Sequence, residues 1–145
     1  MFSHRIKEVM DRRKLVKATA STTVSKAAKL MAAKQVGAVM VVEANRLVGI
    51  FTERDALYRV IAQGLDADTT TIGEVMTASP QTISPDALFG QALYTMAQQR
   101  FRHLPVIDNG VLVGIVSSRS AMDPELEEFA CETARRKHFT RRAMA

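Results

Sequence analysis

The sequence contains an internal repeat, and this repeat constrains the fold more than any other feature of the chain. Segment 6–10, Ile-Lys-Glu-Val-Met, returns as 72–76, Ile-Gly-Glu-Val-Met, with four of five residues identical and an offset of 72 − 6 = 66. Leu-Val-Gly-Ile occurs at 47–50 and again at 112–115, with an offset of 65. One copy of about 55 residues would bury too little apolar surface to be stable alone. The repeat therefore predicts two similar units joined in one globular body.

Apolar residues at helical spacing predict the same type of helix in each copy. They recur over 22–34 in the first copy and over 84–99 in the second, where Ser84-Pro85 supplies an N-cap and a first-turn proline. A further helix is expected over 52–63, with Gly64 in the left-handed conformation that ends many helices. Each copy therefore has one amphipathic helix, and at least the first has a second helix that closes it.

Short apolar segments rich in β-branched residues predict one hairpin in each copy. The four expected strands are 38–42, 47–51, 104–107 and 111–116. Turn-forming residues at 43–46 and 108–110 separate the two strands of each pair. Short extended segments at 16–18 and 81–83 precede the first helix of each copy. The expected fold class is α+β, with two pseudo-symmetric β-α-β-β-α copies packed face to face and clefts where the copies meet.

Two motifs inside this doubled unit resemble the CBS-pair family: Gly49-Ile50-Phe51-Thr52-Glu53-Arg54-Asp55 and Arg102-His103-Leu104-Pro105-Val106-Ile107-Asp108. The resemblance covers roughly residues 5–122 and is to stand-alone bacterial CBS proteins that bind adenine nucleotides. It implies two CBS repeats packed as one CBS pair. It also implies a non-catalytic regulatory module that senses an adenosine-containing ligand: AMP, ADP or ATP, with NAD and S-adenosylmethionine as further options. The adenine nucleotide is then a regulatory ligand, and no cofactor is required.

The resemblance also assigns residues to a main ligand site at the seam between the repeats. It implies that the Thr52 hydroxyl and the start of the following helix bind the phosphate, and that Asp55 binds the ribose hydroxyls. Arg102 and His103 are expected to reach the phosphate. The complete expected main site is Gly37, Ala38, Ile50, Thr52, Arg54, Asp55, Thr82, Arg102 and His103. The alternative is that Thr52 and Asp55 form only a capping box at a helix start.

The second copy departs from this pattern. Ser117 keeps the hydroxyl expected to meet phosphate, but Ser120 stands where the ribose-binding acid belongs. A serine offers one weaker hydrogen bond and no charge to strengthen it. Ser117, Arg119 and Ser120 are therefore expected to form a second, weaker site, and one strong site is expected in each chain.

The chain divides into a first repeat at 1–67, a second at 68–122 and a C-terminal helix with a basic tail at 123–145. Asp123 and Pro124 are expected to be the N-cap and the first residue of this helix. Its narrow apolar stripe consists of Leu126, Phe129, Ala130 and Thr133. We expect the helix to dock on its own subunit or on a neighbouring one, and the chain to form a homodimer that regulates an unidentified protein.

Composition narrows the classes of function. The formal charge of +5 comes mainly from the two ends: 5–17 carry six basic residues against two acidic ones, and 133–145 carry five against none. Basic ends are usually solvated, so we do not expect a nucleic-acid partner. The longest apolar run, 36–42, is far shorter than the roughly 20 residues of a membrane span. Since Cys131 is the single cysteine and no signal peptide is recognisable, we expect a cytoplasmic protein.

Catalysis finds no support in the residue pattern. The three histidines, His4, His103 and His138, lie in a terminus, the seam and the tail, and no nucleophile and base can be paired with them. No phosphate-binding glycine loop or metal-ligand cluster is recognisable. Two non-catalytic alternatives to ligand sensing stay open: a structural dimerisation module with a vestigial site, and a nucleic-acid-associated protein that acts through its basic ends.

Overall fold

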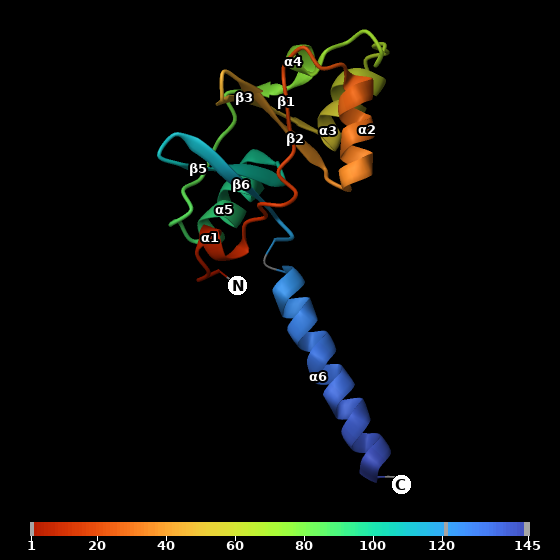
Figure 1. The fold of residues 1–145 in the computed structure, drawn as a ribbon, viewed down its shortest axis with the longest axis vertical. Coiled ribbons are helices and arrows are strands. Elements are labelled where there is room, and N and C mark those ends of the chain that lie inside the picture. The colour runs from red at the N-terminus through yellow and green to blue at the C-terminus, as the bar shows by residue number, and fades with distance from the viewer. Residues whose placement is uncertain (1, 121, 144–145) are drawn as a thin grey trace.

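The computed structural model describes residues 2–120 and 122–143, with the side chains of all of these except 122–125, 127 and 140–143. Figure 1 shows two α+β units stacked on each other and a long C-terminal helix, α6 (Met122–Ala143), that extends away from both. Both units contain a helix followed by a two-stranded hairpin, as the repeat predicts. Within the described residues, no helix combines the length and the apolar character needed to cross a bilayer.

The first unit contains a sheet in the order β1-β2-β3-β4, with β1 parallel to β2 and the other pairs antiparallel. Its elements are β1 (Lys17–Ala18), α2 (Val24–Lys34), β2 (Ala38–Glu43), β3 (Arg46–Thr52), α3 (Glu53–Asp55), η1 (Ala56–Ile61), which is wound as a π-helix, and β4 (Thr77–Ala78). Thr23 caps α2 by accepting a hydrogen bond from the Lys26 amide. Gly64 takes the expected left-handed conformation, with φ 67°. The predicted helix and hairpin of the first copy are confirmed within about two residues at each end.

The second unit contains α5 (Phe89–Gln99), β5 (His103–Asp108) and β6 (Val111–Ser117). Its hairpin is confirmed, and so is its turn. Asn109 and Gly110 have φ values of 49° and 80°, and Ala44 and Asn45 at the tip of the first hairpin have 47° and 61°. Two successive residues with positive φ are the type I′ geometry that matches the twist of antiparallel strands.

The predicted start of the second amphipathic helix is wrong. Ser84 accepts hydrogen bonds from the amides of Asp86 and Ala87 in a turn, and α5 begins only at Phe89. The reason is a distant segment: the amides of Ile6 and Lys7 donate to the carbonyls of Ala87 and Pro85, both at 2.9 Å. These carbonyls are therefore not free to form the first turn of a helix.

The short helices that precede each copy are exchanged between the two units. In α1 (Ile6–Val9), Ile6 is fully buried in the core of the second unit, together with Phe89 and Leu104. In α4 (Ile72–Val75), Ile72 and Val75 complete the core of the first unit. Figure 1 shows α1 beside α5 and α4 beside β3. The division at 67/68 is a division of the chain, whereas in space the two repeats interlock.

The glycines of the repeated Leu-Val-Gly-Ile motif receive the methionines of the exchanged segments. An added Cβ at Gly49 would lie 2.2 Å from Met76 Sδ, and one at Gly114 would lie 2.9 Å from Met10 Sδ. In both units the segment after the methionine also extends the sheet: β4 pairs with β3, and Asp11 pairs with Ile115 of β6. Each glycine is required because a thioether occupies the space of its missing side chain.

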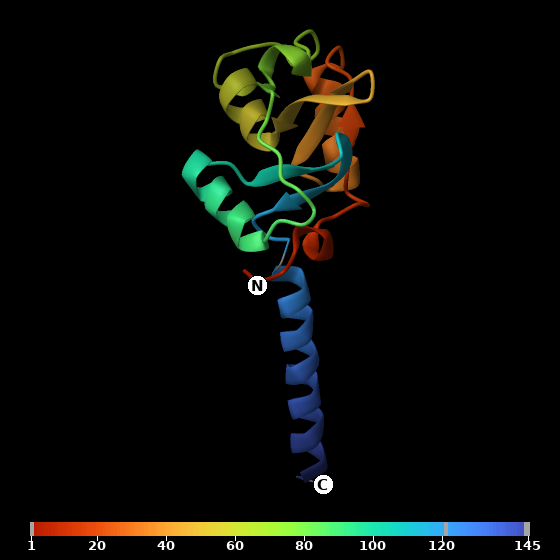
Figure 2. The same cartoon turned by 90° about the vertical axis from the view of Figure 1, so that its left-hand side faces the viewer.

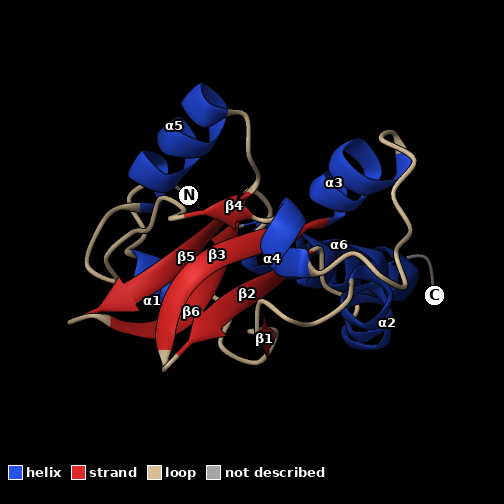
Figure 3. Ribbon diagram, turned by 90° about the horizontal axis from the view of Figure 1, so that it is seen from above, coloured by secondary structure: helices blue, strands red, loops and turns tan. Residues whose placement is uncertain are grey.

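The two units pack through an apolar layer between their hairpins. The buried members of this layer are Ala38, Met40, Ile50, Leu112 and Ile115. From above, the strands form the middle of the body, with α2, α3 and α5 outside (Figure 3). The predicted face-to-face packing is confirmed.

The helix after the first hairpin, η1, packs on the core of its unit, whereas the described apolar side chains of α6 are exposed. Val60 of η1 is buried in the first core, whereas Leu126 and Phe129 of α6 are 56% and 69% exposed. Figure 2 shows α6 pointing away from both units. Among the described side chains, docking of α6 on its own chain is therefore not observed. The helix begins at Met122, one residue before the expected cap, and the side chains of Asp123 and Pro124 lie outside the described residues.

Candidate functional site

A cavity of about 950 Å³ lies at the seam of the two units. It is lined by residues of five segments: 9–14, 35–38, Glu53, 102–103 and residues 115 and 117–120. Residues 9–14, 102–103, 115 and 117–120 belong in space to the second unit. Residues 35–38 and Glu53 belong to the first unit. Its volume is within the range of about 300–1,000 Å³ that is typical of small-molecule sites.

The charge on the cavity wall is mainly positive. Five cationic side chains line it: Arg12, Arg13, Lys14, Arg102 and Arg119. Only two acidic residues, Asp11 and Glu53, lie among them. Within the described residues, none of the five cationic side chains has a hydrogen-bond or ion-pair partner. Like charges that converge without partners repel one another, so the wall is suited to an anionic ligand.

The basic segment 12–14 is held at the cavity by Asp11. One carboxylate oxygen, Oδ1, accepts hydrogen bonds from the amides of Arg13 at 2.8 Å and Lys14 at 2.9 Å. The backbone of Asp11 also exchanges two hydrogen bonds with Ile115 of β6. The turn is therefore fixed on the sheet while its three cationic side chains are exposed to solvent.

The turn after β6 forms the opposite part of the wall. Ser120 Oγ accepts a hydrogen bond from the Ser117 amide at 2.8 Å and lies 3.3 Å from Ser117 Oγ. The amide of Ser118 donates to the carbonyl of Arg102 at 3.1 Å, which ties this turn to the start of β5. Both hydroxyls and the Arg119 side chain are thereby placed at the cavity.

His103 of the second unit lies close to Gly37 of the first unit. Its ring nitrogen Nε2 lies 3.3 Å from the position of a Cβ added at Gly37, and a Glu53 oxygen lies at the same distance. Burial lowers the pKa of His103 below its usual value of 6.5, the Glu53 carboxylate acts in the opposite direction, and Arg102 adds to the lowering. The imidazole is therefore neutral at pH 7, and a side chain at position 37 would crowd it.

Thr52 and Asp55 are paired with each other in this structure. Asp55 Oδ2 accepts hydrogen bonds from the Thr52 amide at 2.9 Å and the Thr52 hydroxyl at 3.1 Å. Asp55 Oδ1 lies 3.5 Å from Arg59 Nε. Arg59 in turn donates to the carbonyls of Val75 and Met76 at the C-terminal end of α4. With 8% of its surface exposed, Asp55 forms the capping box that was the alternative assignment. The serine pair of the second unit has the same geometry.

Arg54 is also engaged elsewhere. Its guanidinium donates to the carbonyl of Arg100 at 2.6 Å and lies 5.9 Å above the ring of Tyr58. Arg100 ends α5 in the left-handed conformation, two residues before Arg102. Arg54 therefore holds the backbone just before Arg102 and His103 against the first unit. Its own side chain does not line the cavity.

The structure brings together some of the expected site residues and separates others. Gly37, Ala38, Arg102, His103, Ser117, Arg119 and Ser120 line the cavity. Thr52, Arg54 and Asp55 do not line it, Ile50 is buried between the hairpins, and Thr82 is exposed next to Ile83. The cavity thus contains all of the expected second site and four residues of the expected main site. Which site binds more tightly stays a prediction.

Sequence reasoning missed the cationic segment 12–14, which it assigned to a solvated end. The available signal was the position of the segment: it directly follows the repeated motif 6–10 and directly precedes the extended lead-in at 16–18. Glu53 was also missed, although it lies within the motif on which the resemblance depends.

Two interlocked α+β repeats around a shared cavity define a tandem-repeat module. The sequence matches the CBS domain family twice, over residues 6–62 and 72–124. The chain therefore belongs to the CBS domain family and is a CBS pair, a type of regulatory module. A structure of a conserved protein from Pyrococcus horikoshii, 29% identical, superposes with a TM-score of 0.79 and covers 86% of this chain and 94% of that one.

Two relatives illustrate how such pairs occur. CBSCBSPB3 of Arabidopsis thaliana is 42% identical over 96 residues, which are 66% of this chain and 17% of that protein. The present chain thus corresponds to less than a fifth of this larger relative. YhcV of Bacillus subtilis is 41% identical over 66% of this chain and 67% of its own length. A CBS domain protein from Pyrobaculum aerophilum, PAE2072, was solved as a complex with AMP; it is 27% identical, with a TM-score of 0.73, over 81% of this chain and 89% of that one.

Proposed function

We propose that this chain is a non-catalytic regulatory module that binds an adenosine-containing phosphate ligand in the cavity between its repeats. The observation that carries the proposal is the convergence on one cavity wall of five cationic side chains that have no partner among the described residues. A phosphate accepts several charge-assisted hydrogen bonds, and guanidinium groups can donate two in parallel. A bound phosphate would relieve the repulsion between these cations, so ligand binding and packing of the seam are coupled.

The composition of the wall also supports a nucleotide rather than a simple anion. Apolar side chains line the cavity beside the cations: Val9, Met10, Val36, Ala38 and Ile115. Apolar surface of this kind suits a flat base, and a few polar groups fix the orientation of a ligand. The complex of the Pyrobaculum relative with AMP favours adenine among the bases.

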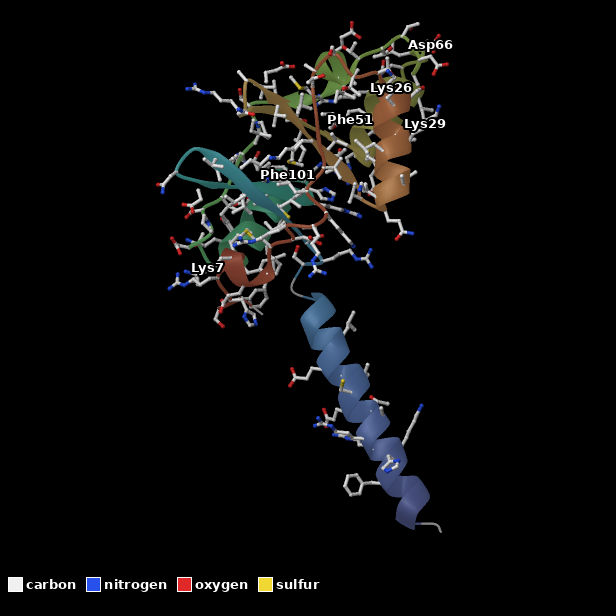
Figure 4. The ribbon with its side chains drawn as sticks, in the orientation of Figure 1. Lys7, Lys26, Lys29, Phe51, Asp66 and Phe101 are labelled. Carbon is white, nitrogen blue, oxygen red and sulfur yellow. The ribbon has the colours of Figure 1, made fainter. Side chains whose placement is uncertain are left out.

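Isothermal titration calorimetry with AMP, ADP, ATP and the matching guanine nucleotides tests this function. We expect saturable binding of adenine nucleotides and weaker binding of guanine nucleotides. Arg102→Ala should reduce affinity about tenfold or more, because it removes one charge-assisted contact of about 1.5–3 kcal/mol. Lys29→Ala is the control, since Lys29 lies on α2 and does not line the cavity (Figure 4). Absence of binding by every nucleotide would refute the proposal.

We also propose that the chain is a homodimer. Apolar side chains of η1 are exposed on the first unit: Leu57 is 51%, Tyr58 58% and Ile61 70% exposed. Three neighbouring apolar side chains on one short helix are typical of a surface that a partner covers. A second copy is the proposed partner, and the same face could transmit the state of the cavity to a regulated protein.

A further inference from the structure

We propose that the segment Arg12-Arg13-Lys14 makes the cavity selective for ligands that carry two or three linked phosphates over those that carry one. The segment acts as a specificity determinant: it adds positive charge to the wall for any phosphate and adds direct contacts when the phosphate chain is longer. This inference rests on the proposed function, because it concerns the same cavity.

The wall offers two separate groups of cations. The backbone segments that carry Arg102 and Arg119 are joined by the hydrogen bond from the Ser118 amide to the Arg102 carbonyl. Together with the hydroxyls of Ser117 and Ser120, they form the group that a single phosphate requires. The other group, residues 12–14, comes from a different turn and is fixed by Asp11. A monophosphate can be bound by the first group alone, so the second group is in excess.

Charge supports the same conclusion. Five cationic and two acidic residues line the cavity, which gives 5 − 2 = +3. A terminal phosphate carries about −2 at pH 7, and each further linked phosphate adds about −1. A monophosphate therefore leaves the wall at about +1 (3 − 2), a diphosphate neutralises it (3 − 3 = 0), and a triphosphate exceeds the wall charge by about one unit. The volume of about 950 Å³ leaves room for the longer chain.

The side chains of the segment are suited to this role. They are exposed, and within the described residues they have no partner, so a ligand does not need to break an existing contact. Their backbone is held at both sides, by Ile115 through Asp11 and by the pairing of the Val16 carbonyl with the Met40 amide. Cationic side chains on a fixed turn lose less entropy on binding than those on a mobile tail.

The test compares AMP, ADP, ATP and inorganic triphosphate by calorimetry in the absence of divalent cations. For the wild-type protein we expect affinity to rise roughly three- to tenfold with each added phosphate, since exposed charge pairs are individually weak. The variant R12S/R13S should lower ATP affinity by a larger factor than AMP affinity, so that most of the gain for ADP and ATP over AMP is lost. The matched control is K26S/K29S, which removes two charges from α2, outside the cavity (Figure 4).

The outcomes separate this inference from the proposed function. Equal affinity of the wild type for AMP and ATP, or ATP binding by R12S/R13S that matches the wild type, overturns the selectivity while the nucleotide site stands. Failure of the wild type to bind any adenine nucleotide refutes the site itself. Inorganic triphosphate distinguishes the source of the phosphate chain: binding stronger than that of ATP overturns the nucleotide as ligand, and weaker binding supports it. Circular dichroism spectra and thermal melts that match those of the wild type show that each variant is folded.

Discussion

Replacement of Gly49 by alanine tests the interlocked packing of the repeats most directly. The new Cβ would lie 2.2 Å from Met76 Sδ and 3.0 Å from Met76 Cγ. Ordinary contact begins at 3.4 Å, so the sulfur must move by about 3.4 − 2.2 = 1.2 Å. Met76 lies against the first core beside Val75, and its displacement disturbs that core. Overpacking of this kind costs about 1–3 kcal/mol of unfolding free energy.

The second unit provides a matched comparison. At Gly114 the nearest atom, Met10 Sδ, lies at 2.9 Å, so the required movement is only 3.4 − 2.9 = 0.5 Å. Gly114→Ala should therefore destabilise the protein less than Gly49→Ala. Neither glycine has a positive φ, so the expected effect is steric and does not arise from backbone conformation.

Urea denaturation followed by circular dichroism measures both effects. The decisive comparison is a double-mutant cycle of Gly49→Ala with Met76→Ala. Truncation of Met76 makes room for the new methyl group, so the double variant should be more stable than the sum of the single effects by about 1 kcal/mol or more. Strictly additive effects would show that Met76 does not occupy this space and would refute the steric reasoning.

Four further predictions concern the site and the surface. Asp55→Ala should lower the unfolding free energy by about 1–2 kcal/mol through loss of the cap and, by the sequence-based assignment, weaken nucleotide binding ten- to a hundredfold; unchanged affinity in calorimetry contradicts that assignment. Ser120→Asp should tighten binding of adenine nucleotides but not of inorganic triphosphate, because only the nucleotide has a ribose, and equal changes for both ligands contradict this. The pKa of His103 is lowered on folding, so below pH 6.5 the unfolded state binds the proton more strongly. Its contribution to stability is therefore complete above pH 6.5 and is lost as the pH falls through the lower pKa of the folded state; thermal melts of the wild type and His103→Gln test this, and identical pH profiles contradict it. Sedimentation should give a dimer of the 16.0 kDa chain, and Ile61→Glu should give a monomer; a wild-type monomer at micromolar concentration contradicts the dimer.

Local sequence predicted the hairpins and their turns because the required information is local. Asn109-Gly110 readily adopts positive φ, and the apolar strands on either side can pair only with each other at that loop length. The Thr52 cap was equally predictable as one of two alternatives, since a threonine three residues before an acid at a helix start forms a capping box. In these cases the partners lie within a few residues of each other.

The start of α5 could not be predicted in this way. Ser84-Pro85 is a good local signal for a helix, but the amides of Ile6 and Lys7 occupy the carbonyls that such a helix would use. The partners are about 80 residues apart in the chain, and no local pattern reveals the competition. The same separation explains why residues 12–14 were assigned to a solvated end.

The sequence by itself determined that the chain is a doubled α+β unit of the CBS family, because the repeat, the hydrophobic spacing and the turn residues all act over short distances. The tertiary structure alone decided where charge collects. The exchange of α1 and α4 carries the segment after α1 onto the second unit, where Arg12, Arg13 and Lys14 meet Arg102 and Arg119 at one cavity. Coulomb repulsion and anion affinity depend on distances in space, and the packing of the two interlocked cores fixes these distances.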